Sequence, residues 1–303
     1  MSGGIAVLKH FIASKAEIIS GMQHVEFFHR DHFEYKYHRK KASHELSRFI
    51  DFFWETDFEA LYSNYPNGFS DALFPNIGYT YLINLGTPFV MQLDDERFEI
   101  KSDGFLPRHC NMICHHSEGN KIFGIKFKVS PVVFEKNVNF SEYKEYIFPL
   151  AYLIDRKVIA EIKKADSFLT RVEIISKYYK EVIQQHSGSL KYVDIVTEIL
   201  DECYTNNDFS LSIEELAAKY KVSSRTLQRY FEKATSISSK QALQIIRIRK
   251  AVEDLTNDPE SFNYQKYGYY DYSHFHKHLK NFIGSHSINI IEPHLKLLKG
   301  VQL

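Results

Sequence analysis

A short stretch near residue 225 carries side chains that can hydrogen-bond to the edges of DNA bases. Arg225 and Arg229 are four residues apart, with Thr226 and Gln228 between them. Arginine can pair in bidentate fashion with guanine, and glutamine can do the same with adenine, so a helix with this face suits the DNA major groove. Composition alone favours an ordinary solvated helix face, because exposed Arg and Gln are common in proteins.

The residues around this stretch predict two short helices joined by a tight turn. Ser212 and Glu215 have the spacing of a capping box, which starts the first helix. Ser223 can cap the second helix, and the small Ala217 lies where the two would cross. The expected apolar faces are Ile213, Leu216, Ala217 and Tyr220 on the first helix and Leu227, Tyr230 and Phe231 on the second. Two such helices form a helix-turn-helix unit.

A second unit of similar design follows after a long helical spacer. Asp271 can cap a helix whose apolar stripe is Phe275, Leu279 and Phe282, and Gly268 supplies the turn before it. The polar side chains of this helix point elsewhere: Tyr272, Ser273, His276, Lys277 and Lys280. Residues 239–256 between the units predict one amphipathic helix about 27 Å long, at ~1.5 Å per residue. A rigid spacer of this size could present two reading helices to successive major grooves, which lie about 34 Å apart.

Residues 208–284 resemble the DNA-binding domain of AraC/XylS-type transcription regulators. The motifs that carry the resemblance are LSIEELA at 211–217, SSRTLQRYF at 223–231, RIRKA at 247–251, GYYDYSHF at 268–275 and KNFIG at 280–284. The resemblance implies sequence-specific binding to promoter or operator DNA, and it outweighs the solvated-face alternative. It also implies the residues that contact bases and backbone: Arg225, Thr226, Gln228 and Arg229 in the first unit, and Tyr272, Ser273, His276 and Lys277 in the second.

Two departures from the family pattern concern the second unit. Asn263 and Tyr264 stand where family members carry Ile-Ala, which predicts a shifted or irregular first helix. Residues 285–290 replace the Pro and the aromatic residue that follow the final glycine in the family. The second unit therefore either reads sequence loosely or holds phosphates more than bases.

The half of the chain before residue 186 has a sequence pattern typical of strands followed by helices. Short β-branched or aromatic runs predict strands at 78–84, 88–93 and 122–128. Apolar residues at three- and four-residue steps then predict helices between 131 and 186. The polar stretch at 184–189 is the best linker candidate.

This half resembles the sensor-like domain of a branch of the same family. The motifs are FIDFFW at 49–54, FPN at 74–76, YLINLG at 81–86 and FGIKF at 123–127. The resemblance implies a β-rich barrel or cupin-like domain followed by helices that contribute dimer contacts. The expected fold class is therefore α+β. We expect a sensing or dimerisation domain at 1–186 and a DNA-binding domain at 190–303 with its core at 208–284.

One cluster in the N-terminal half contains enough imidazole and thiolate for a zinc site. It is the run HCNMICHH at residues 109–116. On a strand, Cys110, Cys114 and His116 would share one face, while His109 and His115 would share the other. The paired C-x2-C spacing of structural zinc sites is missing, so the three residues on one face are weak metal candidates and satisfied strand residues are favoured.

The composition limits the class of protein. Lys and Arg number 38, equal to Asp and Glu, and 44% of residues are hydrophobic, which excludes a disordered chain. Residues 208–303 nevertheless carry a net charge of +4 and the rest −4, which mildly favours a nucleic-acid-binding end. No run is apolar enough for a membrane helix, and three cysteines are too few for a disulfide framework. We expect a cytoplasmic protein without a membrane partner.

Catalytic motifs are missing from the sequence. It has no glycine-rich phosphate loop, G-x-S-x-G elbow or H-E-x-x-H pair, so neither an enzyme nor a bound cofactor is expected. The expected partners are double-stranded DNA, a small-molecule effector and a second copy of the chain. Two alternatives stay open: a ligand- or metal-binding β-barrel protein with a degenerate helical domain, and an adaptor whose second unit binds protein.

Overall fold

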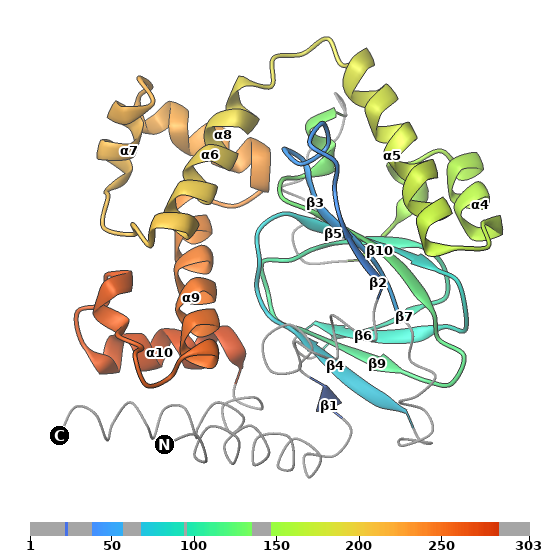
Figure 1. Ribbon diagram of the computed structural model, residues 1–303, viewed down its shortest axis with the longest axis horizontal. Helices are drawn as coiled ribbons and strands as arrows, with labels where there is room; N and C mark the ends of the chain where they lie inside the picture. Colours follow the sequence, from blue (N-terminus) through green and yellow to red (C-terminus); the bar gives the residue numbers. More distant parts are fainter. Residues whose placement is uncertain (1–21, 24–37, 57–67, 94–95, 135–146, 285–303) are drawn as a thin grey trace.

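The structure, a computed structural model, consists of a β-rich N-terminal part and a helical C-terminal part that lie side by side (Figure 1). It describes residues 22–23, 38–56, 68–93, 96–134 and 147–284. The replacement of the family's Pro and aromatic residue after Gly284 lies outside the described residues.

Eleven strands in the described part of the chain form two sheets. The six-stranded sheet has the order β11 (Phe148–Pro149), β8 (Gly104–Pro107), β5 (Tyr79–Asn84), β10 (Ile122–Phe127), β3 (Ile50–Glu55) and β2 (His38–Lys41). The five-stranded sheet has the order β1 (Met22–Gln23), β4 (Phe69–Leu73), β9 (Met112–His116), β6 (Phe89–Leu93) and β7 (Glu96–Ile100). Among the strands that the structure describes, only β1 and β4 pair in parallel. The α+β class is confirmed, but the sheets face each other instead of closing into a barrel (Figure 1).

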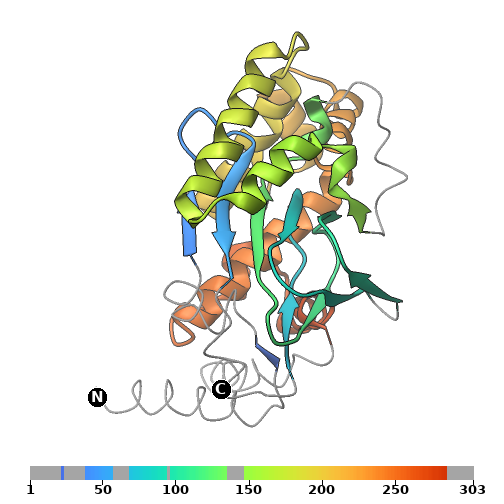
Figure 2. The same cartoon turned by 90° about the vertical axis from the view of Figure 1, so that its right-hand side faces the viewer.

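The two sheets differ in how their strands are covered. Strands β6 and β9 alternate buried and half-buried residues, which is typical of a sheet with one face on a core. Strands β5 and β10 of the six-stranded sheet are buried at every position. Helices cover the outer face of this sheet, so both faces of its central strands are shielded from water (Figure 2).

A helical hairpin packs on the six-stranded sheet. It consists of α4 (Arg156–Lys164) and α5 (Phe168–Gln185) and follows two short 3-10 turns, η1 (Pro131–Phe134) and η3 (Leu150–Tyr152). Phe127 and Phe123 of β10 meet Tyr179 and Phe168 of α5, with ring centroids 5.4 and 6.1 Å apart. The helices predicted between 131 and 186 are therefore confirmed as a layer on the sheet.

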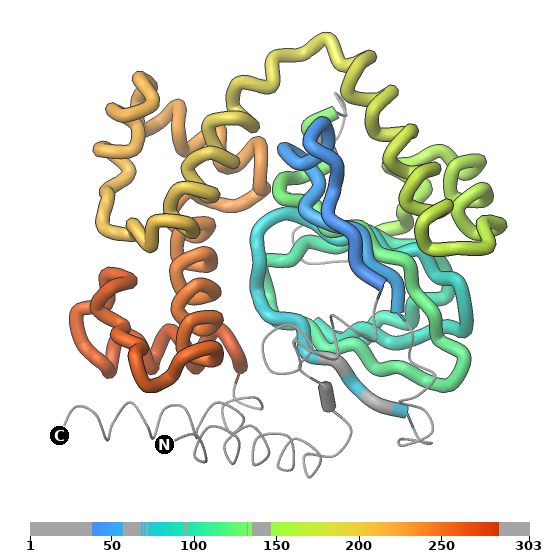
Figure 3. The backbone as a smooth tube through the Cα atoms, viewed as in Figure 1, coloured from blue at the N-terminus to red at the C-terminus, as the bar shows by residue number. Residues whose placement is uncertain are grey.

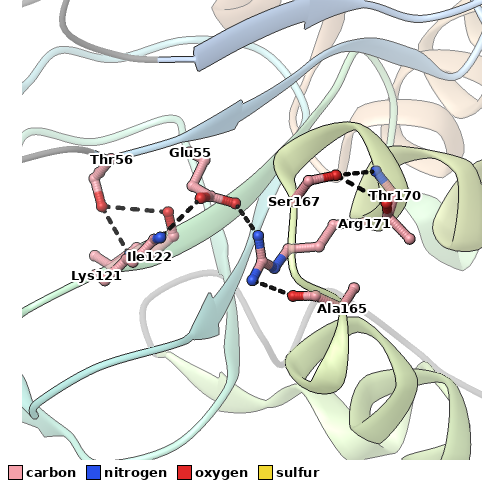
Figure 4. A network of polar contacts seen from close by, with 8 residues as sticks. All are labelled: Glu55, Thr56, Lys121, Ile122, Ala165, Ser167, Thr170 and Arg171. Carbon is pink, nitrogen blue, oxygen red and sulfur yellow. Dashed lines mark hydrogen bonds and ion pairs between the residues drawn. The ribbon is translucent and has the colours of Figure 1, made fainter.

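A buried ion pair fixes α5 to β3 (Figure 4). The Glu55 carboxylate accepts from Arg171 at 3.0 Å and from Lys121 at 3.1 Å, and its side chain is only 4% exposed. The guanidinium of Arg171 also donates to the carbonyl of Ala165, at the turn between α4 and α5. Because breaking a buried pair leaves an uncompensated charge, this contact fixes the hairpin to one place on the sheet.

The helical part begins after the linker region. It comprises α6 (Lys191–Asn206), α7 (Ile213–Lys219), α8 (Ser224–Thr235), α9 (Ser239–Asn257), η4 (Tyr264–Tyr267) and α10 (Tyr272–Ile283). Helices α6, α7 and α8 gather around one end of α9, and η4 and α10 around the other, as the tube in Figure 3 shows. None of the helices in the described ranges is long and apolar enough to cross a membrane.

The two parts are joined by more than the linker. One continuous core runs from the six-stranded sheet through α5 and α6 to α8. The backbone amide of Ser130 donates to the carbonyl of Ala234 at 2.6 Å. Lys128, just after β10, pairs with Asp201 of α6 at 3.2 Å. These contacts hold the first helix-turn-helix unit in a defined position against the sheets.

Candidate nucleic-acid interface

The first helix-turn-helix unit begins with a complete capping box. The Ser212 hydroxyl accepts from the amide of Glu215 at 3.2 Å, and the Glu215 carboxylate accepts from the amide of Ser212 at 2.7 Å. These hydrogen bonds hold the pKa of Glu215 below its usual range. Ala217 is buried on α7, as the predicted helix crossing requires, and Lys221 takes a positive φ in the turn. The predicted start and turn of this unit are confirmed.

Helix α8 separates a buried face from an exposed one. Ser223 caps it by accepting from the amide of Thr226 at 3.1 Å. Leu227 and Phe231 are fully buried, so they fix the rotation of the helix. Arg225 and Arg229 are exposed on the opposite side. Two guanidinium groups are thus presented to solvent from a helix whose other face is fully packed.

Gln228 has a second role that its position in the sequence did not indicate. Its side-chain NH2 donates to Glu232 at 2.8 Å, and its carbonyl oxygen accepts from the Ser239 hydroxyl at 2.6 Å. The amide of Gln228 therefore ties α8 to the first turn of α9. Ser239 lies outside the periodic pattern of α8, so helical spacing alone could not reveal this partner.

Helix α9 connects the two units as one rigid rod. It spans 19 residues, or about 28 Å at ~1.5 Å per residue, and confirms the expected continuous helix. Ser238 caps its start by accepting from the amide of Gln241. Its buried side chains are divided between two cores: Ala242 and Ile245 pack toward the first unit, and Val252 and Leu255 toward the second.

The second unit lacks a regular first helix. Its place is taken by the 3-10 turn η4, which Asn263 caps by accepting from the amide of Gln265 at 2.9 Å. Gly268 follows with φ +74°, a conformation that side chains with a Cβ rarely adopt. Tyr264, which replaces the family's alanine, is buried and stacks on Phe275 with ring centroids 6.1 Å apart. A large ring cannot allow the close helix crossing that alanine allows, so the irregularity predicted from this position is confirmed.

Helix α10 presents its four predicted contact residues in two different settings. Asp271 caps the helix by accepting from the amide of His274 at 2.7 Å. Ser273 and Lys277 are exposed. Tyr272 and His276 are half-buried and stack on each other at 5.7 Å. The structure therefore brings all four residues to one helix, but only two extend fully into solvent.

A half-buried histidine, His278, connects α10 to the residues that precede it. The Nδ1 atom of His278 and the Tyr269 hydroxyl share a hydrogen bond of 2.8 Å. Burial, followed by the nearby charges of Arg247 and His274, lowers the pKa of His278 to about 4. Arg247 of α9 also lies over the Tyr269 ring, 4.4 Å from its centroid. The imidazole is therefore neutral at pH 7, and it links α10 to Tyr269.

The structure does not gather the weak metal candidates Cys110, Cys114 and His116 into a three-ligand cluster. Cys114 and His116 lie inward on β9, while Cys110 precedes the strand and is half-buried. His116 is hydrogen-bonded to Asn120 at 2.6 Å and stacks on Phe89 at 5.8 Å. Among the residues that the structure describes, no group of three or more His, Cys, Asp or Glu side chains could hold a metal ion.

Comparison with known proteins identifies the C-terminal part. The family model described as "Helix-turn-helix domain" matches residues 216–286. No curated protein matches the sequence. ToxT from Vibrio cholerae O395 is a similar solved structure, with 13% identity, coverage of 71% of this chain and 89% of that chain, and a TM-score of 0.41.

Two further solved structures show the same low level of similarity. ToxT from Vibrio cholerae strain SCE256, bound to an unsaturated fatty acid, is 12% identical over 72% of this chain and 88% of that chain, with a TM-score of 0.40. The AraC-like transcriptional activator CuxR is 12% identical over 74% of this chain and 90% of that chain, with a TM-score of 0.29. The family match and the paired units agree on one conclusion: the C-terminal part of this chain is an AraC-type helix-turn-helix DNA-binding domain of a transcription regulator.

Proposed function

We propose that the protein binds specific DNA sequences through two helix-turn-helix units that enter successive major grooves. The observation that carries this proposal is the exposed pair Arg225 and Arg229 on the capped, fully packed helix α8. A recognition helix needs a fixed rotation, because each base contact depends on where its side chains point. The buried face of α8 supplies that fixed rotation.

The eight proposed contact residues divide into two groups by their surroundings. Arg225, Arg229, Ser273 and Lys277 are exposed and would make the most direct contacts with bases and phosphates. Thr226, Gln228, Tyr272 and His276 are half-buried and bonded or stacked within their units. We propose two roles for the second group: they contact DNA at the edge of the groove, and they hold their helices in place.

The N-terminal part, for which we propose the boundaries 1–186, would sense a small molecule or join two copies of the chain. A sheet interior that faces the helical part supports the sensing role, because a ligand there would touch both parts. Dimerisation would place two pairs of reading helices on one operator and raise specificity without further contacts by each chain.

The experiment is a fluorescence-anisotropy titration with tiled duplexes from upstream of the gene, at several salt concentrations. The proposal predicts one tile that binds far more tightly than the others and loses affinity in Arg229→Ala. Lys233→Ala is the matched control, because Lys233 is an exposed cation of the same helix that lies over the Tyr192 ring of α6 instead of facing outward from α8. Equal affinity for every tile would contradict sequence-specific binding.

A further inference from the structure

The reading helix α8 and the spacer helix α9 are joined by a short turn at residues 236–238. Ser236 takes a positive φ of 65°, and Ser238 caps α9 by accepting from the amide of Gln241 at 3.1 Å. The first amides of a helix have no acceptor within the helix, so each needs a partner from outside it. Ser239, the first residue of α9, is 1% exposed. Water therefore cannot readily reach its amide, and the partner must come from the protein.

The side chain of Gln228 on α8 supplies this partner. Its Oε1 atom accepts from the Ser239 backbone amide at 3.3 Å as well as from the Ser239 hydroxyl at 2.6 Å. Its Nε2 atom donates to the carboxylate of Glu232, four residues further along α8, at 2.8 Å. One side chain of the reading helix thus caps the buried start of the spacer helix, and a neighbour on its own helix holds its other end.

The chemistry of these partners fixes which way the amide group of Gln228 points. A backbone N–H can only donate a hydrogen bond, and an ionised carboxylate can only accept one. Turning the amide group over would place its NH2 against the Ser239 N–H and its oxygen against the Glu232 carboxylate. Only the orientation with the oxygen toward α9 satisfies both partners.

These contacts leave too little of the Gln228 amide group for adenine. A bidentate pair with adenine needs the oxygen to accept from N6 and the NH2 to donate to N7. The oxygen already accepts two hydrogen bonds, which occupy both of its lone pairs, and one of the two NH2 hydrogens is directed at Glu232. The remaining hydrogen can make one contact at the edge of the groove. N7 of adenine and N7 of guanine accept such a hydrogen alike, so it does not select adenine.

We infer that Gln228 positions α8 instead of reading adenine, and that the first unit recognises guanine through Arg225 and Arg229. Both arginines are exposed on α8, and a guanidinium pairs in bidentate fashion with O6 and N7 of guanine. The bonds from Ser239 to Gln228 hold α8 against the start of α9, and with it the directions in which the two arginines leave the helix. The preference for guanine rests on the proposed DNA-binding function, whereas the cap on α9 does not.

The first test measures the cap on α9 without DNA. Gln228→Met keeps the length of the side chain but removes the acceptor, so the Ser239 amide of the full chain should exchange its hydrogen about 2- to 10-fold faster. Gln244→Met is the matched control, because Gln244 is an exposed glutamine of α9. It should leave exchange at the Ser239 amide as in the wild type. Unchanged exchange at this amide in Gln228→Met overturns the proposal, whether or not the chain binds DNA.

The second test compares the duplexes that each variant selects from a random-sequence library. Gln228→Glu combined with Glu232→Gln exchanges the amide and the carboxylate, so it keeps an acceptor for Ser239 and a donor beside that acceptor. It has no amide group at position 228 with which to read adenine.

We expect the combined variant and the wild type to select the same bases, with guanine at the positions whose preference is lost in Arg225→Ala or Arg229→Ala. Gln228→Met should weaken binding to all selected duplexes by a similar factor, without relaxing the preference at any single base pair. Loss of an adenine preference at one position in the combined variant, with wild-type exchange at the Ser239 amide, overturns the proposal. A wild type that selects no sequence contradicts the proposed function and the guanine preference together, and hydrogen exchange still decides the cap.

Discussion

The two helix-turn-helix units share a plan but differ in how their cores are built. The first has a regular α7 with a capping box, a buried Ala217 at the crossing, and a core it shares with α6. The second replaces its first helix with the turn η4 and fills its core with aromatic rings. It also takes one ring, Phe74, from the β-rich part.

We infer from this difference that the two units have different roles in DNA binding. The first unit shares one continuous core with the six-stranded sheet through α5 and α6, and this core buries Leu227 and Phe231 of its reading helix. The second unit has a separate core, to which the β-rich part contributes the single buried ring of Phe74 among the described residues, so we expect its docking to be the easier of the two to change. We infer that the first unit supplies most of the sequence-specific affinity and that the second adjusts it.

The largest expected effect is on the first unit. Replacing Arg225 and Arg229 together with alanine should lower affinity for the operator about 30- to 20,000-fold, because each bidentate contact contributes about 1–3 kcal/mol. Anisotropy titration against operator and random duplexes measures the loss. If the double variant still prefers the operator, base recognition does not depend on these residues of α8.

The next largest effect is on the stability of the second unit. Phe74→Ala removes a buried ring and should lower the free energy of opening of that unit by about 3 kcal/mol or more. Hydrogen exchange over residues 264–283 measures the opening, and residues 213–235 serve as the internal reference. Equal loss of protection in both units would mean that they do not differ in their dependence on the β-rich part.

The two units should also differ in their response to acid. The pKa of His278 is about 4 in the folded second unit, against 6.5 for the unperturbed group. The unfolded state therefore binds the proton more readily, and this contribution to stability is complete above pH 6.5 and is lost as the pH falls toward 4. The first unit contains no histidine between residues 208 and 257.

Chemical denaturation at pH 7 and pH 5 tests this difference. The wild type should lose stability between the two values, and His278→Gln should lose less. His274→Gln is the matched control, because His274 is exposed on the same helix. Identical losses in the wild type and His278→Gln would show that the His278 imidazole is not the source of the acid sensitivity.

A smaller effect is expected at Lys277 of the second unit. If Lys277 binds a phosphate, Lys277→Ala should weaken binding equally across sequences and reduce the slope of log affinity against log salt by about 1. Anisotropy at four salt concentrations measures both quantities. A loss confined to the operator would instead make Lys277 a base-reading residue.

The smallest effect concerns the helix starts. Ser212→Ala should lower the free energy of unfolding by about 1 kcal/mol, because it removes the capping box of α7. Asn263→Ala, at the cap of the short turn η4, should lower the free energy of unfolding by less, because only a short 3-10 turn follows it. Paired urea denaturation curves compare the two. A larger cost at Asn263 would contradict the view that the first unit depends more on its helix caps.

The sequence predicted features whose causes are local. The helix caps at Ser212, Ser223 and Asp271 involve residues no more than three positions apart. The sequence therefore predicts them directly, and the structure confirms them. The departure of Asn263 and Tyr264 from the family pattern predicted the irregular first helix of the second unit. The strands β5, β6 and β10 followed from short β-branched and aromatic runs.

The remaining features depend on contacts between distant residues. Arg249 meets Pro75 across 174 positions, and Arg171 meets Glu55 across 116. The FPN motif that contains Phe74 stood out in the sequence, but nothing near it shows that its ring enters the second unit. Lys126 lies between apolar neighbours in the run that predicts strand β10, so the sequence pattern indicates a strand and gives no sign that this side chain lines a cavity.

Hydroxyl-radical footprinting of the full chain on its operator tests the central claim most directly. The account predicts two protected patches on one face of the duplex, about one helical turn apart. Arg225→Ala with Arg229→Ala should abolish the footprint, and Lys233→Ala should keep it. A single protected patch, or a footprint that survives the loss of both arginines, would contradict reading by two units of which the first supplies most of the affinity.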